Sequence, residues 1–483
     1  MGGLARGDRD GAGTEAGTGA GTGARGGVRE RVAVIGSGVA GLTAAYLLQR
    51  RYDVLLFEAD DRLGGHAHTH DLLDTRGAAL AVDSGFIVHN ERTYPNLLRL
   101  FHELGVGTQD TDMSMSVRCA GCGLEYAGAK GPRGVFAGSG SARSGRFLRM
   151  LGEIKRFHRD ARRLLENGRL PRPHGAKHVL ASVSGSAQHE PDTITLGRFL
   201  ELGGYSSFFT AHFIVPLVSA VWSTGPDLVM RYPARYLFEF LRHHGMLSVG
   251  GSPQWRTVTG GSRRYVERAV KGLSAVNLTT PVRAVVRHAE GATVWDDFGS
   301  SHRVDRVVVA THSDQALAIL ADATPAERTV LGAIGYARNE TILHTDASLL
   351  PRSVAARSSW NYFMPGCGTR GAQAEAAPEA AAPAETGGRA VVSYHMNRLH
   401  RFAAEQDYLV TLNATAQIDP SAVIARMVYE HPVYTPESVA ARARLPELTT
   451  SRVAFAGAYH GWGFHEDGCA SGVAAAAAFG VSW

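Results

Sequence analysis

The chain has 483 residues, of which 44% are hydrophobic and 20% are charged, and its formal net charge is +5. These values are ordinary for a globular protein, and the length exceeds what one compact core accommodates, so we expect two domains. The modest positive charge is compatible with acidic substrates or an anionic membrane surface, but no dense basic run is interleaved with aromatic residues, which argues against nucleic acid as a partner.

The first 29 residues are mostly Gly, Ala, Thr and Arg, with almost no large apolar side chain. Such a segment cannot bury enough surface to become ordered, so we predict a disordered tail over 1–29. The tail lacks the apolar core of a signal peptide and does not predict export. The four cysteines of the chain make no disulfide framework, which favours a reducing, cytoplasmic location.

A glycine-rich turn follows the first apolar strand. The run 32–35 is apolar and β-branched, which predicts a buried parallel strand, and Gly36-Ser37-Gly38-Val39-Ala40-Gly41 comes directly after it, followed by a helical pattern. In such a turn Gly36 permits the sharp bend, Gly38 lets the backbone approach a pyrophosphate, and Gly41 lets the helix pack against the strand. The helix N-terminus adds N–H groups that favour phosphate.

A second strand, residues 53–57, ends at Glu58, which lies 17 residues after Gly41. At this place a carboxylate accepts hydrogen bonds from both hydroxyls of a ribose, and an acid favours FAD or NAD over NADP. Strand, glycine turn, helix, strand and acid together predict a dinucleotide-binding site.

The sequence after Glu58 extends this pattern with Asp60-Asp61-Arg62-Leu63-Gly64-Gly65-His66, and the motifs 453–457, 461–464 and 466–472 lie near the C-terminus. With these residues the chain resembles the flavin-containing amine oxidase and phytoene desaturase superfamily, over about residues 31–483. It is most similar to a bacterial subgroup of predicted NAD/FAD-binding amine oxidase-like proteins, through segments 83–86, 394–399 and 463–468.

The resemblance implies an α/β fold: a Rossmann-type FAD-binding domain assembled from three pieces, as in glutathione reductase, with an inserted α+β substrate domain. We expect the FAD-binding domain over 31–110, 255–315 and 450–483, and the substrate domain over 111–254 and 316–449. A low-complexity loop is expected over 366–388.

We predict non-covalent FAD as the cofactor, although Cys469 lies close to the C-terminal segment that passes the flavin in the superfamily. The glycine pattern and the resemblance together assign the following residues to the cofactor: Gly36, Ser37, Gly38, Val39, Ala40, Gly41, Glu58, Ala59, Arg62, Leu63, Gly64, Gly65, His66, Val282, Gly457, Glu466, Asp467 and Gly468.

Local patterns predict the other elements. We expect a strand over 83–90, a helix over 93–104, short strands within 111–128 and mainly helices over 193–245, including an apolar helix over 208–222 that Pro216 kinks. Strands are expected over 276–286, 293–295 and 304–310.

A long amphipathic helix is expected over 146–167, and its basic face admits two interpretations. A basic amphipathic helix can lie on an anionic membrane, which would give peripheral membrane contact. The alternative is a solvated face over an ordinary core. The basic residues are Arg149, Lys155, Arg156, Arg159, Arg162 and Arg163.

Cys119-Ala120-Gly121-Cys122 is a closely spaced cysteine pair with no second pair near it in the sequence. A structural zinc site needs four ligands. We therefore interpret the pair as a surface turn and predict no metal site.

In a flavoenzyme the cofactor performs the redox step, and the protein places the substrate against it. The candidates for catalysis are His465, His460 and Trp462, because in amine oxidases aromatic residues of the corresponding segment line the substrate cage. The alternative is that these residues hydrogen-bond the flavin or fill space. Six further residues are candidates for an apolar pocket: Trp222, Trp255, Trp360, Tyr394, Met396 and Asn397.

Many amine oxidases of the superfamily carry a lysine that holds a water against flavin N5, downstream of the strand that meets the adenine. Here the last lysine is Lys271, upstream of that strand, and arginine is a poor replacement. The sequence therefore favours an FAD-dependent oxidoreductase that transfers hydride between flavin N5 and an apolar, lipid-linked substrate, as a desaturase or isomerase does. The alternatives are an amine oxidase that uses oxygen and a flavin-binding redox module without turnover.

Overall fold

The computed structural model describes residues 29–138, 140–172, 193–248, 250–367 and 389–483. The tail predicted over 1–29 and the loop predicted over 366–388 therefore lie almost entirely outside the described residues. Within the described residues, no helix is both long and apolar enough to cross a bilayer.

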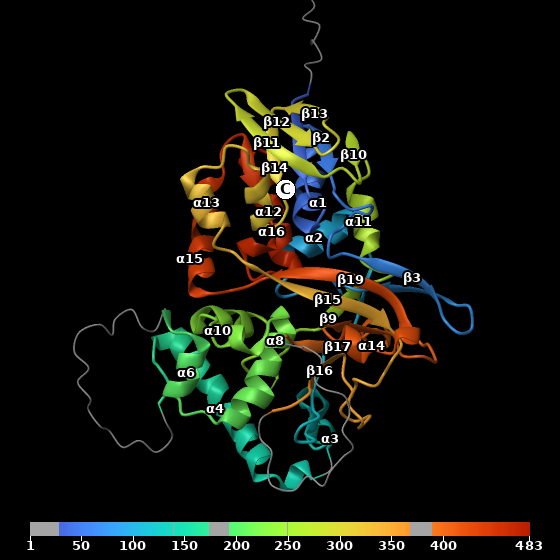
Figure 1. Cartoon of the computed structure of the whole chain (residues 1–483), viewed down its shortest axis with the longest axis vertical. Helices are drawn as coiled ribbons and strands as arrows, with labels where there is room; N and C mark the ends of the chain where they lie inside the picture. The colour runs from blue at the N-terminus through green and yellow to red at the C-terminus, as the bar shows by residue number, and fades with distance from the viewer. Residues whose placement is uncertain (1–28, 139, 173–192, 249, 368–388) are drawn as a thin grey trace, which may run out of the picture.

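A five-stranded parallel sheet forms the upper part of the molecule in Figure 1. Its strand order is β10-β2-β1-β14-β20, and neighbours are joined in parallel register. The strands are β1 (Arg31–Ile35), β2 (Asp53–Phe57), β10 (Ala275–Asn277), β14 (Arg306–Val309) and β20 (Val453–Phe455). They come from three distant segments of the chain, and the predicted Rossmann-type fold class is confirmed.

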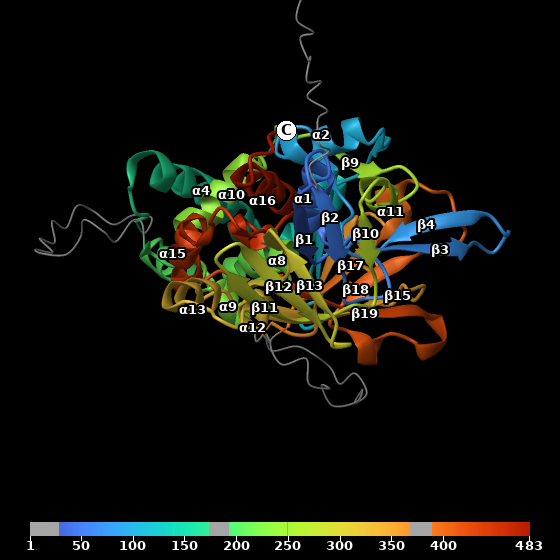
Figure 2. The same ribbon diagram turned by 90° about the horizontal axis from the view of Figure 1, so that it is seen from above.

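The alternating side chains of β1 face two different layers. Val32 and Val34 pack with helices α1 (Val39–Leu48) and α16 (His465–Ala478). Ala33 and Ile35 pack with the antiparallel meander β11–β13 on the other face, as the view from above in Figure 2 shows. The meander strands are β11 (Val282–His288), β12 (Gly291–Asp296) and β13 (Ser301–Val304). Because both faces are covered, β1 is apolar at nearly every position.

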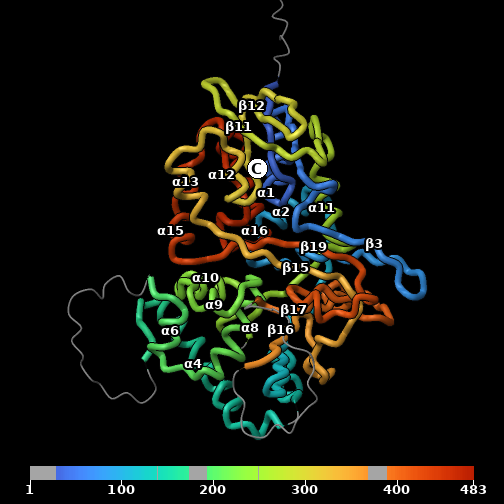
Figure 3. Tube along the Cα trace, in the orientation of Figure 1, coloured from blue at the N-terminus to red at the C-terminus, as the bar shows by residue number. Residues whose placement is uncertain are grey.

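The lower part of the molecule combines a seven-stranded sheet with a block of helices, and the chain passes between the two parts several times (Figure 3). The sheet order is β19-β15-β18-β17-β16-β7-β8, with β16 and β7 parallel and the other neighbours antiparallel. Its strands are β7 (Met115–Cys119), β8 (Glu125–Ala127), β15 (Tyr336–His344), β16 (Trp360–Met364), β17 (Val391–His395), β18 (Leu409–Leu412) and β19 (Val423–Pro432).

The helical block matches the predictions for the region 146–245. Its elements are α4 (Gly145–Asn167), α6 (Leu196–Leu202), α7 (Ser207–Phe209), the π-helical turn η3 (Thr210–Ile214), α8 (Val215–Trp222), α9 (Pro226–Val229) and α10 (Ala234–His243). The apolar helix predicted over 208–222 is thus α7, η3 and α8 in succession. The irregular turn precedes Pro216 because proline has no N–H to bond the carbonyl four residues earlier.

Two of the predicted strands are wrong in part. Residues 84–88 are not a strand but connect β4 (Ala79–Asp83) to β5 (His89–Asn90), although the N–H groups of Ser84 and Phe86 donate to the carbonyls of His68 and His66 and so extend the pairing of β4 with β3 (Thr69–Leu73). The strand expected over 276–286 is divided into β10 and β11 by a turn in which Thr279 has φ +51°. The helix α2 (Pro95–Glu103) is confirmed.

Helices α1 and α16 approach closely at Gly472. A Cβ atom at Gly472 would lie 2.4 Å from the Ala40 carbonyl oxygen and 2.9 Å from the Thr43 Cβ atom. The helix pair therefore requires glycine at this point, because a backbone carbonyl cannot move aside as a flexible side chain can.

We expect Gly472→Ala to destabilise the fold by about 1–3 kcal/mol, the range for overpacking a core. Gly152→Ala is the matched control, since Gly152 also lies in a helix but a Cβ there would meet nothing within 4 Å. Removing a helix glycine without a clash should stabilise by roughly 0.5–1 kcal/mol. Urea unfolding of both variants measures the difference, and equal stabilities would contradict the proposed contact.

Candidate functional site

The glycine turn after β1 leaves one side of its backbone open. Gly36 has φ +98°, and a Cβ atom there would lie 2.7 Å from the Ala310 carbonyl oxygen. A Cβ atom at Gly41 would lie 2.0 Å from the Gly36 carbonyl oxygen, whereas one at Gly38 would meet nothing within 4 Å. Gly36 and Gly41 are therefore needed for packing, while Gly38 faces the open space that an approaching pyrophosphate requires.

Glu58 ties the glycine turn to the segment after β2. Its carboxylate accepts hydrogen bonds from the Ser37 N–H at 2.9 Å, from the Ser37 hydroxyl at 2.5 Å and from the Asp60 N–H at 3.0 Å. The Thr280 N–H donates to the Glu58 carbonyl at 2.8 Å. Thr280 precedes Val282 by two residues, so the start of β11 is brought near this acid. The expected ribose acid and the expected adenine strand are thus neighbours, and their contacts with the cofactor stay predictions.

The second glycine pair lies against the first turn. The Gly64 N–H donates to the Ser37 hydroxyl at 3.0 Å, and Arg62 donates to the Gly65 carbonyl at 2.8 Å. Gly64 and Gly65 have φ +108° and +55°, a backbone region that favours glycine. The motif 60–66 therefore folds back over residues 36–38, as expected of a segment that encloses a diphosphate.

His66 has a buried polar atom without a hydrogen-bond partner beside this turn. Its Nε2 atom has no hydrogen-bond partner among the described residues. Its ring lies 4.9 Å from that of Tyr429 and 5.2 Å from that of His431, both on β19. Burial and the neighbouring His431 lower the pKa of His66 well below its usual value, so the ring is neutral. A buried polar atom without a partner indicates a missing ligand group.

The C-terminal segment 453–472, here called the return segment, runs beside the glycine turn. The Gly457 N–H donates to the Ser471 hydroxyl at 2.9 Å, and a Cβ atom at Gly468 would lie 2.6 Å from a methyl group of Val39. The first turn of α16 therefore reaches the first turn of α1. This contact joins the two ends of the predicted cofactor site.

The carboxylates of Glu466 and Asp467 both cap helices. Glu466 accepts from the backbone N–H groups of Asn96 and Leu97, each at 3.0 Å, at the N-terminus of α2. Asp467 accepts from the Phe464 N–H at 2.9 Å and so closes the first turn of α16. Both carboxylates are thus hydrogen-bonded within the protein, and their contacts with the cofactor stay predictions.

Several titratable side chains lie around this turn. The side chains of His66, His431, His460, His465 and Asp467 are enclosed by protein atoms, and their pKa values are shifted accordingly. The same residues nevertheless keep some accessible surface, as residues around a ligand cavity do. We therefore expect the FAD cavity among these residues, beside Gly38 and His66.

The three residues predicted to act in catalysis lie near one another in the chain but have different surroundings. His465 stacks on Phe86 with ring centres 3.7 Å apart, and its Nε2 atom lies 3.2 Å from the Tyr265 hydroxyl. Burial lowers the pKa of His465 to about 3. These contacts match the alternative in which His465 fills space and hydrogen-bonds.

His460 and Trp462 each have a side-chain nitrogen without a hydrogen-bond partner. Neither the Nε2 atom of His460 nor the Nε1 atom of Trp462 has a partner among the described residues. Burial lowers the pKa of His460 to about 4, with a smaller contribution from Arg442. A neutral imidazole of this kind can accept a proton or a hydrogen bond. The catalytic roles of both residues stay predictions.

An aromatic wall joins the helical block to the return segment. It consists of Trp222, Tyr236, Phe240, Trp462 and Phe464. Phe240 and Phe464 stack with centres 4.9 Å apart, and Trp222 lies 4.6 Å from Phe240. The indole N–H of Trp222 donates to the Trp462 carbonyl at 2.9 Å, and the Tyr236 hydroxyl donates to the Gly461 carbonyl at 2.7 Å.

The other residues predicted for an apolar pocket divide into separate places. Trp360 and Tyr394 form an edge-to-face pair with ring centres 5.1 Å apart, and Trp255 lies over His244. Met396 is fully buried. Asn397 donates to the Gln406 carbonyl and accepts from the Tyr408 N–H, so it holds a loop together and does not face a pocket.

Sequence reasoning missed four residues of this region. Tyr236 and Phe240 lie one helical turn apart on α10, in a region that the sequence analysis predicts only as mainly helical. Tyr429 and His431 lie on the same face of β19, and the Tyr429 hydroxyl is 2.8 Å from that of Ser84. The two-residue spacing on β19 is the signal that would have identified them.

Comparison with known proteins identifies the family. The family model described as flavin containing amine oxidoreductase matches residues 39–341. The chain belongs to this family. Its cofactor is therefore FAD, in agreement with the cavity and the open glycine turn. That the FAD is non-covalent stays a prediction, and the Sγ atom of Cys469 accepts from the Thr43 hydroxyl between α1 and α16.

Similar proteins include amine oxidases and a lipid enzyme. The predicted flavin-containing monoamine oxidase AofH of Mycobacterium tuberculosis is 31% identical over 279 residues, which is 56% of this chain and 54% of AofH. The chain thus spans about half the length of the curated relative it matches. Cyclohexylamine oxidase from Brevibacterium oxydans superposes with a TM-score of 0.61 at 17% identity, covering 93% of this chain and 98% of that one. A CLA-producing fatty acid isomerase from P. acnes superposes with a TM-score of 0.59 at 15% sequence identity, covering 92% of this chain and 97% of that one. At such identities the structures show a shared fold.

We expect Glu58→Ala to weaken FAD binding about tenfold to hundredfold, because charge-assisted hydrogen bonds contribute roughly 1.5–3 kcal/mol. Titration of the apoprotein with FAD, followed by flavin fluorescence, measures the dissociation constant. Asp61→Ala is the control, since Asp61 is an exposed acid three residues away. A dissociation constant in Glu58→Ala equal to that of the control would exclude Glu58 from the site.

Asp467 should make stability depend on pH. Removal from water raises the pKa of its carboxyl to about 7, so between about pH 4 and pH 7 the folded protein binds this proton more tightly than the unfolded chain. Stability from this group therefore falls as pH rises through that window. The amide of Asp467→Asn keeps an acceptor for the Phe464 N–H but cannot ionise. We expect its Tm, relative to wild type, to increase from about pH 5 to about pH 8. Parallel pH profiles would contradict the burial of this charge.

Proposed function

We propose that this protein is an FAD-dependent oxidoreductase that transfers hydride between an apolar, lipid-linked substrate and flavin N5. The observation that carries the proposal is the aromatic wall, where α8 and α10 meet the return segment. Trp462 and Phe464 keep accessible surface, and the buried rings of Trp222, Tyr236 and Phe240 pack against them. The two accessible rings would favour hydrocarbon at roughly 25 cal/mol per Å² of buried apolar area. Family membership supports the flavin chemistry, and the wall supports the class of substrate.

The charge pattern also favours a neutral substrate. No lysine follows Lys271 in the chain, so a lysine-bound water cannot serve the flavin from the segment where amine oxidases carry it. Asp467, a carboxylate close to the wall in sequence, accepts a hydrogen bond from the Phe464 N–H, and removal from water raises its pKa to about 7. It is therefore a poor partner for a substrate ammonium group.

Bound FAD supplies the hydride acceptor, and the chain's own residues supply position and proton transfer. The wall would hold a hydrocarbon chain and exclude water from it. In a desaturation, one C–H bond is lost as hydride and the neighbouring C–H bond is lost as a proton. The Nε2 atom of the neutral His460 imidazole has no hydrogen-bond partner among the described residues, and we propose it as the acceptor of this proton.

The amine oxidase alternative keeps support from the resemblance to AofH and to cyclohexylamine oxidase. The desaturase- or isomerase-like chemistry proposed here is supported by the likeness to a fatty acid isomerase. The Arg156 side chain, assigned from sequence to a basic face, bonds the Gly203 carbonyl at 2.7 Å and lies over Tyr205. Arg159 and Arg163 remain exposed, and they are the part of α4 that we propose for membrane contact.

Anaerobic mixing with candidate substrates tests the proposal. We expect unsaturated fatty acids or phospholipids to bleach the oxidised flavin, or to reoxidise the photoreduced flavin, and simple primary amines to do neither. Trp462→Ala should raise the half-saturating lipid concentration about tenfold or more, because Trp462 is a partly accessible ring of the wall and its loss removes an aromatic contact. The control is Phe298→Ala, because Phe298 is 73% exposed.

Rapid bleaching by an amine, together with no response to lipid, would establish the amine oxidase alternative. A flavin that responds to neither class, with FAD fully bound, would favour the redox module without turnover.

A further inference from the structure

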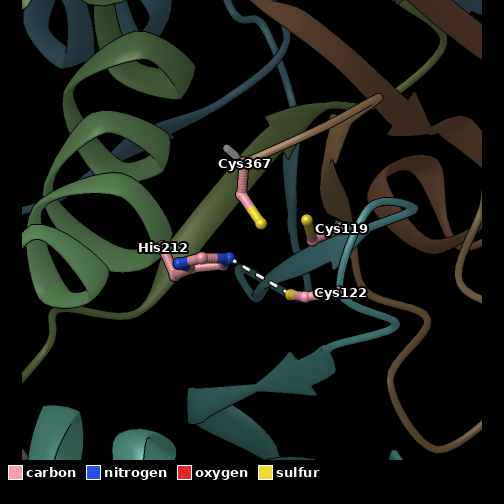
Figure 4. Close-up of side chains that lie close together, drawn as sticks. All are labelled: Cys119, Cys122, His212 and Cys367. Carbon is pink, nitrogen blue, oxygen red and sulfur yellow. Dashed lines mark hydrogen bonds between the residues drawn. The ribbon is translucent and has the colours of Figure 1, made fainter. Parts of the chain in front are cut away.

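Four metal-ligating side chains meet in the lower part of the molecule, away from the cofactor cavity. Cys119, Cys122, His212 and Cys367 converge so that their three sulfur atoms and one imidazole nitrogen all lie within 4.8 Å of one another. Figure 4 shows the four side chains pointing toward a common centre. The Cys122 Sγ atom is 3.4 Å from the His212 Nε2 atom. Three of the four cysteines of the chain are in this cluster.

The two cysteines of the predicted surface turn are held by hydrogen bonds at the end of β7. The Gly123 N–H donates to the Cys119 carbonyl at 2.9 Å, and the Cys119 N–H donates to the Leu124 carbonyl at 2.8 Å. Gly123 has φ +74°, which lets the chain turn back into β8. The turn was predicted correctly, and it directs both sulfur atoms to one side. Two further side chains of metal-ligating type, those of His212 and Cys367, come to this pair from distant segments, which the sequence pattern did not indicate.

Strand β16 brings Cys367 to the turn. It runs parallel to β7 with Met364 opposite Cys119, and the Ala120 N–H donates to the Met364 carbonyl at 2.8 Å. A Cβ atom at Gly121 would lie 3.0 Å from the Gly366 Cα atom and 3.2 Å from the Cys367 nitrogen. Glycine at position 121 therefore permits the close approach of the segment that carries Cys367.

His212 is positioned by the irregular turn η3. Its Nδ1 atom lies 3.0 Å from the Phe208 carbonyl, the arrangement of an N–H donor, which leaves the Nε2 lone pair facing the sulfur atoms. Its ring stacks on Phe208 at 4.1 Å. Because Pro216 cannot donate to the His212 carbonyl, that oxygen accepts from the Tyr126 hydroxyl at 2.7 Å. Both the ring and the backbone of His212 are thus fixed.

We propose that Cys119, Cys122, His212 and Cys367 bind a structural Zn²⁺ ion. Three thiolates and one imidazole form a complete tetrahedral set with no open position, as in structural zinc sites. With Zn–S about 2.3 Å and Zn–N about 2.0–2.1 Å, neighbouring ligand atoms should lie roughly 3.5–3.8 Å apart. The observed 3.4 Å between Cys122 and His212 is close to this value. The ion would join the β7–β8 turn, η3 and the end of β16.

The metal content of the full-length, FAD-loaded protein tests the proposal. We expect about one zinc per chain after purification without chelator, and at least a tenfold lower content in Cys122→Ser and Cys367→Ser, since losing a ligand costs more than losing a group that orients one. Cys469→Ser is the matched control, because Cys469 is the one cysteine outside the cluster, and it should keep its zinc. Replacement of zinc by Co²⁺ should give the absorption bands of tetrahedral cobalt thiolate, at longer wavelength than the flavin bands.

The result does not depend on the substrate of the flavin. Wild-type protein that contains no zinc and takes up no Co²⁺ would overturn the proposal, as would iron with labile sulfide or a disulfide between the cluster cysteines. Zinc retained in both serine variants would also overturn it. If those variants fail to fold, the zinc content and the Co²⁺ spectrum of the wild-type protein decide the matter.

Discussion

The close packing of α1 against α16 is the contact on which the cofactor site depends. Two glycines of α16, Gly468 and Gly472, lie against the first turns of α1, and a side chain at either position would meet Val39 or the Ala40 carbonyl. This contact brings a segment from the far end of the chain beside the glycine turn that follows β1. The open face at Gly38 and the return segment therefore border one cavity, although more than 400 residues separate them in sequence.

Burial suppresses the charge of the histidines around the predicted cofactor site. It keeps His66, His460 and His465 neutral, while the carboxylates of Glu58, Glu466 and Asp467 accept hydrogen bonds from backbone N–H groups. Removal from water is the physical reason for the lowered pKa values of the three histidines. The proposal of a hydrocarbon substrate rests on the same kind of effect, the removal of apolar surface from water.

Sequence was sufficient for the parts of the site that follow local rules. The strand, glycine turn and acid up to Glu58 are contiguous, and each has a backbone requirement that only certain residue types meet. The two-residue spacing of Tyr429 and His431 shows that they share a face of β19, but their place beside His66 depends on tertiary packing that the spacing does not specify. The cluster of Cys119, Cys122, His212 and Cys367 was not predicted for a related reason. Cys122 and His212 are 90 residues apart, and the parallel pairing of β16 with β7 brings Cys367 to them.

The strand order of the upper sheet also sets the order of folding. Strands β1 and β2 leave the ribosome early, but their neighbours β14 and β20 are made much later, and α16 is completed only at Ala478. The apolar faces of β1 and α1 are therefore synthesised well before the segments that cover them. Contacts of such large sequence separation form slowly. The glycine turn and the return segment, which are predicted to hold FAD together, can meet only after α16 has been made.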